Sequence, residues 1–214
     1  MNKNNFTVYD YLETVINEDY RLITYTDTHI PEISVFVAGV YYNKKYYSFK
    51  EEFETVKDDI IENDERLDRH SFVFCVVNNN NDICCTLKLF MKDSPEWKLP
   101  IEEEFGIDLN YFEEMPVFEI GRFASNGNIS FNLIISMFEK IMQIIDINKT
   151  RIFASIDKRV YKKLLRLKYP IYAMGDYKFY MGTETIPVGI KVSELFSLKL
   201  GGKNERITEG GQFD

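Results

Sequence analysis

The chain has 214 residues, of which 45% are hydrophobic and 15% aromatic, with 17 phenylalanines and 14 tyrosines. This composition supplies a sizeable core and excludes a wholly disordered chain. The formal net charge of -8 argues against a general nucleic-acid binder, because neutralising phosphates requires a basic surface. No apolar run approaches the roughly 18 residues of a membrane span, and the first residues lack the apolar core of a secretion signal.

In the first half of the chain, the sequence predicts secondary structure clearly only from residue 49 onward, where a helix and then a β-hairpin are expected. Residues 1–19 alternate apolar and acidic side chains in a loosely helical way, whereas periodicity does not separate helix from strand across residues 21–43. Residues 49–63 place apolar side chains at helical spacing. Residues 71–77 and 83–90 are typical of strands, and the intervening NNNND is rich in residues that tolerate a positive φ. We therefore expect a helix followed by a β-hairpin.

The second half alternates strands and helices. The predicted elements, in chain order, are a long loop with a helical turn over 93–116, a strand over 117–124, a nearly all-apolar and hence buried helix over 129–145, a strand over 151–156, a short amphipathic helix over 160–168 and a final strand pair over 172–192. This order predicts an α/β or α+β domain with one mixed sheet flanked by helices, spanning residues 1–195. Residues 196–214 lose the apolar pattern, which favours a mobile tail.

Common catalytic signatures are absent from the sequence. There is no P-loop, no GxSxG, no HExxH and no CxxC, and two histidines are too few for a His-rich metal site. Cys75, Cys84 and Cys85 lie in apolar, strand-like runs, which is typical of reduced packing residues rather than of a disulfide framework or a zinc site. We expect a soluble, cytoplasmic protein without a metal.

The strand VFEIGRFA places two ionisable residues among apolar ones. Strict alternation puts Glu119, Gly121 and Phe123 on one face, and Ile120 and Arg122 on the other. Two interpretations stay open at this point. Either the two charges form a buried ion pair, or Glu119 faces a cleft while Arg122 braces the loop and the glycine lets a substrate approach the sheet.

The segment SNGNIS follows this strand and starts the next helix. Asn128 or Ser130 is a candidate cap, and free amide groups at a helix start favour phosphate groups. A strand that delivers a thioester, followed by a helix end that holds its phosphates, suits a coenzyme A or phosphopantetheine donor.

These residues resemble a known family, the acyl-homoserine-lactone synthases and the related N-acyl amino acid synthases, which have the GNAT acyltransferase fold. Their strand motif is Glu-x-Ser-Arg-Phe-Ala, and this chain has Glu-Ile-Gly-Arg-Phe-Ala at residues 119–124. The acidic run and hairpin at 64–90, with Lys88-Leu89 in place of Arg-Leu, and the loop LPIEEEFGIDL also match the family's order. The resemblance covers roughly residues 58–192. It implies a GNAT-like fold, with a single mixed, mostly antiparallel sheet flanked by helices, and transfer of a fatty acyl group from a carrier thioester to a small amine.

The chain also departs from the family pattern. Gly121 replaces the usual serine, and Lys88 replaces an arginine that it does not equal in bidentate contacts. The N-terminal arginine and tryptophan that enclose S-adenosylmethionine have no clear counterpart, so N-acylation of another, amino acid-like amine is the safer inference. The phosphate loop of ordinary GNAT acetyltransferases is missing, and Leu164 stands near the position of their tyrosine acid, with Tyr161 one turn earlier.

The resemblance implies roles for individual residues. Glu119 is the candidate proton acceptor, directly or through water, because partial burial raises the pKa of a carboxyl group. Arg122 positions the loop, and the backbone amides of Phe123 and Ala124 contact the oxyanion or the pantetheine. The remaining candidates hold the acceptor or the donor phosphates: Asp64, Asp68, Lys88 and Gly121 for the acceptor, and Ser125, Asn128 and Ser130 for the donor. A solvated acidic run is the alternative for the two aspartates.

The partner prediction concerns the short amphipathic helix. Val160, Leu164 and Leu167 share one of its faces, and the rest of its surface is basic: Lys158, Arg159, Lys162, Lys163 and Arg166. This basic face suits an acidic acyl-carrier protein or the phosphates of coenzyme A, with a simply solvated helix as the alternative. The apolar residues of the hairpin and of the 129–145 helix line an acyl tunnel or form plain core. No tightly bound cofactor is expected. A non-catalytic ligand-binding member of the fold, and a structural protein in which Glu119 and Arg122 only pair, remain the rival hypotheses.

Overall fold

The computed structural model describes residues 12–25, 30–43, 52–67, 70–112, 115–127, 129–145, 150–191 and Glu194. Two of the candidate site residues, Asp68 and Asn128, lie outside the described residues. Residues 1–11 and the predicted tail at 196–214 lie outside them as well.

The described residues form nine strands and five α-helices. The strands are β1 (Leu12–Val15), β2 (Tyr20–Tyr25), β3 (Ser71–Asn78), β4 (Ile83–Lys92), β5 (Val117–Ser125), β6 (Arg151–Asp157), β7 (Ile171–Ala173), β8 (Lys178–Tyr180) and β9 (Thr183–Ile190). The helices are α1 (Ile30–Asn43), α2 (Phe53–Leu67), α3 (Pro100–Phe105), the short 3-10 helix η2 (Asn110–Phe112), α4 (Phe131–Ile144) and α5 (Lys158–Arg166).

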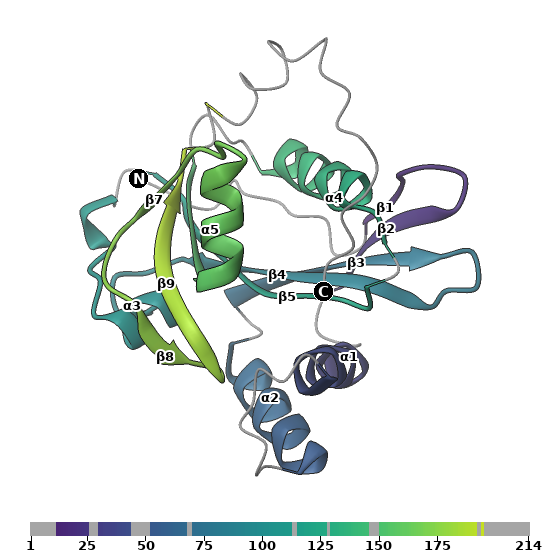
Figure 1. Cartoon of the computed structure of the whole chain (residues 1–214), viewed down its shortest axis with the longest axis horizontal. Helices are drawn as coiled ribbons and strands as arrows, with labels where there is room; N and C mark the ends of the chain where they lie inside the picture. The colour runs from purple at the N-terminus through teal and green to yellow at the C-terminus, as the bar shows by residue number, and fades with distance from the viewer. Residues whose placement is uncertain are drawn as a thin grey trace.

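The strands make one mixed sheet. Its order is β1-β2-β3-β4-β5-β6-β9-β7, and β8 pairs with β9 beside this path. Neighbouring strands run antiparallel except β5 and β6, which run parallel and are connected through α4. The sheet is strongly twisted, so that β9 is steeply inclined to β4 and β5 in Figure 1. The predicted single mixed, mostly antiparallel sheet is therefore confirmed.

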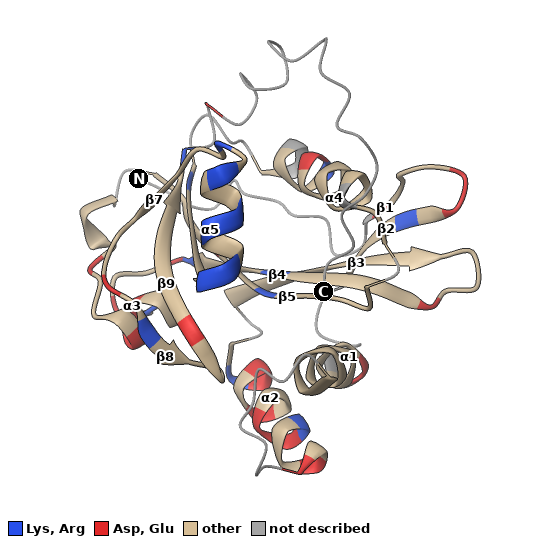
Figure 2. Cartoon of the chain, viewed as in Figure 1, with Lys and Arg blue, Asp and Glu red and all other residues tan. Residues whose placement is uncertain are grey.

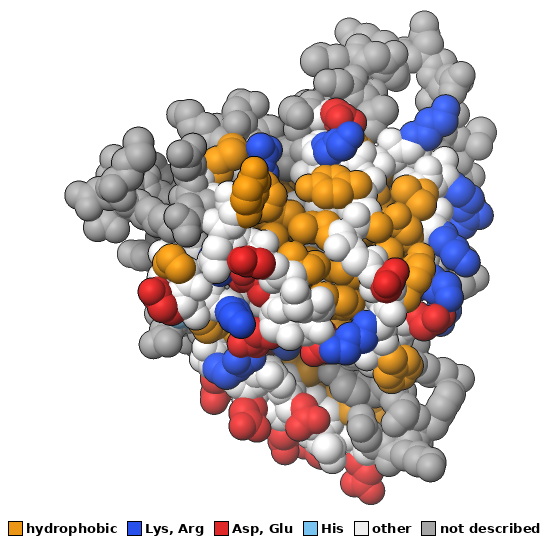
Figure 3. Space-filling model, turned by 90° about the vertical axis from the view of Figure 1, so that its left-hand side faces the viewer, with side chains coloured by type: hydrophobic (Ala, Val, Ile, Leu, Met, Phe, Trp, Pro, Cys, Tyr) orange, Lys and Arg blue, Asp and Glu red, His pale blue; other side chains and the backbone are white. Residues whose placement is uncertain are grey.

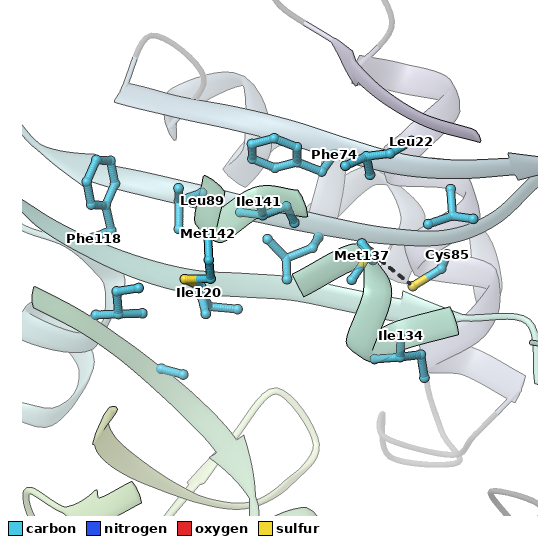
Figure 4. Packing of buried hydrophobic residues seen from close by; sticks show 14 of the residues in the cluster. Leu22, Phe74, Cys85, Leu89, Phe118, Ile120, Ile134, Met137, Ile141 and Met142 are labelled. Atoms are coloured by element: carbon cyan, nitrogen blue, oxygen red, sulfur yellow. Dashed lines mark hydrogen bonds between the residues drawn. The ribbon is translucent and has the colours of Figure 1, made fainter. Parts of the chain in front are cut away.

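Helices cover both faces of the sheet. α1 and α2 lie on one face, where Ile33, Val37 and Ile60 pack against side chains of β2 and β3 (Figure 1). α4 lies on the opposite face over β4 and β5, and its buried Met137, with Cys85, is part of the larger core cluster. Figure 4 shows this cluster, in which the Cys85 Sγ lies 3.9 Å from the Met137 Sδ. Two separate apolar layers thus enclose β4 and β5 in the middle of the molecule.

Local signals explain where the helices next to the site begin. The Ser130 side chain accepts a hydrogen bond from the Leu133 amide and caps α4. Asp157, the last residue of β6, accepts from the amides of Arg159 and Val160 and caps α5. α5 therefore starts directly at the end of β6, whereas α4 starts after residues 126–130, which follow β5.

Two sequence predictions for the fold need correction, and one segment that the sequence left open is resolved. Residues 12–15, predicted as loosely helical, form strand β1, because they pair with β2 at the sheet edge. The ambiguous segment around Pro31 resolves into helix α1. The predicted final strand pair is a set of three strands, since β7 and β8 both pair with β9.

The three cysteines agree with the prediction that they are reduced packing residues. Cys75, Cys84 and Cys85 are free and buried. Within the described ranges, no helix has the length and apolar character needed to cross a membrane, and no cluster of three or more potential metal ligands occurs.

Candidate active site

The candidate site lies where the two parallel strands of the sheet part. β5 and β6 pair only from Val117 with Arg151 to Ile120 with Ala154. Beyond these residues β5 stays paired with β4, and β6 stays paired with β9. The backbone edges of 121–125 and 155–157 therefore face each other across the split without pairing to one another.

A β-bulge in β5 shapes this split. The register shifts between Thr86 and Lys88, so that Arg122 and Phe123 together oppose the single residue Leu87. Arg122 takes the left-handed conformation with φ of 51°, which is uncommon for a residue with a side chain. The bulge turns β5 away from β6 at the point where the two strands stop pairing.

The bulge also corrects the predicted faces of the strand. Arg122 bonds to Asp64 of α2, so its side chain lies on the α2 face and not with Ile120. Phe123 lies on the α4 face, where its ring centroid is 6.2 Å from that of Phe138. The strict alternation assumed from the sequence fails because one extra residue resets it.

Packing explains why glycine occupies position 121, where the family motif has serine. A Cβ at this position would lie 2.6 Å from Cε2 of the Phe90 ring, which is closer than side-chain atoms approach each other. Phe90 of β4 is buried against the same face of the sheet. The aromatic ring thus occupies the space into which the motif's serine would project.

Glu119 does not face a cleft, contrary to one of the two interpretations left open by the sequence. Its side chain is 2% exposed. Its Oε2 accepts a hydrogen bond of 2.8 Å from the Ile101 amide in α3, and its Oε1 lies 3.4 Å from the Ser155 hydroxyl of β6. The carboxyl group is thus sealed between α3 and β6, and it has no direct access to a substrate in this conformation.

The surroundings of Glu119 favour its protonated form. Burial raises the pKa of its carboxyl group from the ordinary 4.5 to about 8, and the Glu102 carboxylate adds to the increase. The Ile101 amide, the Ser155 hydroxyl and the Arg122 charge lower the pKa, but they offset only part of the effect of burial. Glu119 is thus a group that gains and loses a proton near neutral pH, which is what acid–base catalysis requires.

A buried ionic cluster lies on the α1 and α2 side of the bulge. Asp64 Oδ1 accepts from Arg122 Nε at 2.9 Å and lies 3.7 Å from Lys88 Nζ, while Asp64 Oδ2 accepts from the Ser34 hydroxyl at 2.8 Å. Burial lowers the pKa of Arg122, but neighbouring groups, first of all Asp64, outweigh this and raise its pKa overall. Three residues that the sequence predicted from distant positions, Asp64, Lys88 and Arg122, are therefore brought together.

The cluster surrounds a cavity of about 10 Å³ that is lined by Ser34, Asp64, Lys88 and Arg122 together with apolar side chains. This is room for about one water molecule and not for an amine substrate. Asp64 is buried and fully engaged, so neither the solvated acidic run nor direct contact with the acceptor describes it in this conformation. Its evident task is to neutralise Arg122 and Lys88.

The candidate donor-binding residues follow the bulge. Phe123 is exposed, whereas Ala124 and Ser125 are buried. The Ser125 hydroxyl accepts a hydrogen bond from the Gly127 amide at 3.3 Å, and Ser130 is exposed at the start of α4. The two serine hydroxyls thus support the turn and the helix start.

Sequence reasoning missed three residues at this site. Ser155 comes from β6, and Tyr180 and Met181 come from the tight turn between β8 and β9, in which Met181 and Gly182 have positive φ. Met181 Sδ lies 2.9 Å from Nη1 of Arg122. Burial raises the pKa of Tyr180, and the charges of Arg122 and Glu119 act on its hydroxyl. A polar residue at the end of an apolar strand was the available signal for Ser155.

The basic helix α5 packs beside the split, but not on the face that the sequence predicted. Tyr161 and Leu164 are half-buried, whereas Val160 and Leu167 are exposed. Basic residues recur along α5, and acidic residues recur along α2 (Figure 2). Lys158 donates a hydrogen bond of 2.6 Å to Glu184.

Exposed apolar side chains accompany this basic surface. They include Leu165 next to the basic residues of α5, Tyr172 of β7 and Phe179 of β8. Figure 3 views the molecule from the β7 and β8 end and shows apolar side chains gathered across this face, with basic ones along its border.

Comparison with known proteins identifies the fold. The structure is similar to FeeM, an N-acyl amino acid synthase from uncultured soil microbes, with a TM-score of 0.60 and 16% identity over 83% of this chain and 93% of that one. It is similar to the AHL synthase LasI, with a TM-score of 0.59 and 14% identity over 87% of this chain and 98% of that one. The C-terminal condensation domain of Ebony follows with a TM-score of 0.53 and 12% identity over 79% and 97% of the two chains.

The chain has the GNAT acyltransferase fold. The resemblance found in the motif at residues 119–124 is thereby confirmed at the level of the fold. No protein-family model and no curated protein matches the sequence.

Proposed function

We propose that the protein is an N-acyltransferase that moves a fatty acyl group from a carrier thioester to the amine of a small, amino acid-like molecule. The observation that carries this proposal is the split between β5 and β6 directly beside Glu119. The Glu119 carboxyl group is buried next to this split, and its pKa of about 8 gives it the proton affinity that amine acylation needs. The shared fold with an N-acyl amino acid synthase supports the same conclusion.

The donor fits the unpaired strand edges. An extended chain that carries amides, such as phosphopantetheine, forms hydrogen bonds with a free strand edge in the manner of an added strand. The amides of Phe123 and Ala124 follow the bulge and serve as donors to the pantetheine or to the oxyanion. Ser125 and Ser130 lie near the start of α4, where free amides favour phosphates, and we assign Asn128, which falls outside the described residues, to the same role from the sequence. The donor is acyl-CoA or acyl-carrier protein, used as a co-substrate.

The acceptor site lies next to the bulge, near Gly121 and the cluster of Arg122 and Lys88. We assign the amine to an amino acid-like molecule, because an amino acid acceptor is part of the name of FeeM and the residues expected to enclose S-adenosylmethionine have no clear counterpart. Asp64 acts on the acceptor through this cluster. Asp68, which falls outside the described residues, keeps the acceptor-binding role assigned from the sequence. The role of Arg122 is to hold the bulge and to place positive charge beside it.

The carrier partner fits α5. An acidic acyl-carrier protein meets positive charge there in an otherwise acidic molecule, from Lys158, Arg159, Lys162, Lys163 and Arg166. Exposed Val160 and Leu167 lie on the same helix and add apolar contact area. We also assign the protein to the cytoplasm, because its three cysteines are free thiols.

The burial of Glu119 favours one rival, a non-catalytic member of the fold that binds an acyl ligand. One experiment separates the two. Purified protein is incubated with octanoyl, lauroyl or palmitoyl groups, carried by coenzyme A or by acyl-carrier protein, and each of the twenty amino acids, and free thiol is measured. Thiol release that depends on the amine establishes transfer, whereas binding of the acyl donor without thiol release for every pair establishes the rival. Mass spectrometry of lipids from cells that overexpress the protein then identifies both substrates as one N-acylated product.

A further inference from the structure

A sealed carboxyl group raises the question of how a proton reaches it. Glu119 is the candidate proton acceptor, yet its side chain is 2% exposed and the cavity beside Arg122 does not include it among its lining residues. One of its oxygens is taken by the Ile101 amide of α3. Only Oε1 is left to exchange a proton with a group nearer the surface.

Ser155 is the group next to this oxygen. Its hydroxyl lies 3.4 Å from Glu119 Oε1, and its side chain is half-buried where that of Glu119 is sealed. The distance is longer than a usual hydroxyl hydrogen bond, as is common for catalytic hydrogen bonds before substrate binds. A hydroxyl both donates and accepts a hydrogen bond, so it can pass a proton on without holding a charge.

The backbone places Ser155 at the start of the split. The last paired residues of β5 and β6 are Ile120 and Ala154, and Ser155 is the next residue of β6. Ser155 therefore lies between the buried carboxyl group and the place where the strand edges become available to a donor.

We propose that Ser155 is a catalytic residue that relays the proton between the acceptor amine and Glu119. This inference rests on the proposed acyl transfer and adds a residue to it. As the amine nitrogen bonds to the thioester carbon, its proton passes to Ser155 Oγ, and the serine proton passes to Glu119 Oε1. When the C–N bond is complete and the C–S bond breaks, the proton returns by the same route to the leaving thiolate. The serine and the carboxylate are restored, and the products are the amide and the free thiol.

The other groups around Glu119 are less suited to this task. β4 presents the Phe90 ring and β6 the Phe153 ring, both apolar. Glu102 of α3 is buried and accepts hydrogen bonds from the amides of Leu99 and Leu109 and from Lys92. Arg122 stays charged against Asp64. Tyr180 of β8 carries a hydroxyl close enough for Glu119 to influence its pKa, but no hydrogen bond joins the two among the described residues.

The test compares Ser155→Ala with Ser155→Thr, which keeps the hydroxyl, and with Ser94→Ala, a matched change at another half-buried serine. Thiol release is measured with the most active acyl donor and amino acid pair found for the wild type. We expect Ser155→Ala to lower kcat by about 10²-fold or more with little change in KM, while the two other variants stay within about tenfold. A relay acts as a unit with its base, so the double variant Ser155→Ala/Glu119→Gln should be no slower than Glu119→Gln alone.

The outcomes separate the two proposals. If the wild type releases no thiol with any pair, the proposed acyl transfer is overturned, and the relay with it. If the wild type is active and Ser155→Ala keeps kcat within about threefold, the relay alone is overturned. The relay is also overturned if the losses of the two single variants multiply in the double variant, because independent structural effects behave in that way.

Discussion

At the scale of single residues, the proton on Glu119 is the main electrostatic feature of the site. A carboxyl group that is buried with one amide and one hydroxyl for partners cannot offset the lost hydration of its charge. Its raised pKa therefore has consequences both for catalysis and for the stability of the fold, and the stability effect needs no substrate to measure.

The free energy of unfolding should fall as pH rises from about 4.5 to about 8. Below this window Glu119 is protonated in both the folded and the unfolded state, whereas within it the folded state alone keeps the proton. Unfolding then releases a proton and becomes easier, with a slope approaching about 1.4 kcal/mol per pH unit for this group. Above pH 8 the contribution is fully lost.

Glu119→Gln should remove this component, and urea denaturation across the pH range measures it. Glu96→Gln, on an exposed loop, is the control. A Glu119→Gln protein whose free energy of unfolding has the same pH slope as the wild type would show that the carboxyl group is ionised in the folded state.

Gly121 makes a second prediction at this scale. Gly121→Ala should destabilise the protein by about 1–3 kcal/mol, because the new Cβ meets the buried Phe90 ring. Gly39→Ala is the contrasting control, since nothing lies within 4 Å of a Cβ there and a helix interior favours alanine. Urea midpoints measure both, and Phe90→Leu in the Gly121→Ala background should recover part of the loss. Equal stability of Gly121→Ala and the wild type would contradict the account of the motif departure.

At the scale of elements, the bulge in β5 and the ionic cluster depend on each other: the bulge turns Arg122 toward Asp64, and the contact with Asp64 holds the bulge. The left-handed Arg122 costs conformational energy, and its position is held because the side chain reaches Asp64 of α2. The cluster thereby ties β4, β5, α1 and α2 together at the point where β5 leaves β6. The shape of the split thus depends on a salt bridge on the far side of the strand.

Asp64→Ala should lower the free energy of unfolding by about 3–5 kcal/mol, because it leaves Arg122 and Lys88 buried without their counter-charge. Asp64→Asn keeps the size and some hydrogen bonds and should cost less. Glu194→Ala, which breaks an exposed pair with Lys191, should change the stability by less than about 1 kcal/mol. Urea denaturation of the three variants ranks them, and an Asp64→Ala protein as stable as Glu194→Ala would refute the role of the cluster.

The sequence predicted the helices and strands better than it predicted the bulge in β5 and the contacts between elements. The hairpin and the strand–helix order from residue 71 to residue 166 follow from apolar periodicity and turn residues, which are local signals. The bulge does not follow, because strict alternation gives no sign of an extra residue at Arg122. Ser155 was missed for a related reason, since its contact with Glu119 spans 36 residues and depends on the parallel register. The exposure of Val160 and Leu167 depends on which side of α5 meets the sheet, and the helix pattern alone did not settle this.

At the scale of the whole molecule, charge is unevenly distributed. The protein is acidic overall, with the acidic residues of α2 at one end and the basic face of α5 on another side (Figure 2). Such a distribution steers a charged partner toward one orientation before any contact forms.

Reversing charge on the exposed α5 residues, with Arg159→Glu, Lys162→Glu and Arg166→Glu combined, should slow association with an acidic acyl-carrier protein by about tenfold or more at low salt. The difference should shrink as salt screens the charges. Stopped-flow or surface-based binding kinetics measure it, and Lys57→Glu on α2 serves as the control. An association rate that the triple change leaves unaltered would exclude α5 as the docking face.

The short pairing between β5 and β6 has one more consequence for the molecule. Among the described residues, the strand pairing between the β1–β5 part of the sheet and the β6–β9 part consists of four register pairs, from Val117 with Arg151 to Ile120 with Ala154. Because this pairing is short, local opening of the sheet should occur here most readily. Amide hydrogens of the paired residues should therefore exchange faster than those in the middle of β3 and β4. An extended ligand bound between β5 and β6 would form additional backbone hydrogen bonds with both strands and slow that exchange. Ligand binding would then be detected as slower amide exchange, because the two parts of the sheet move less relative to each other.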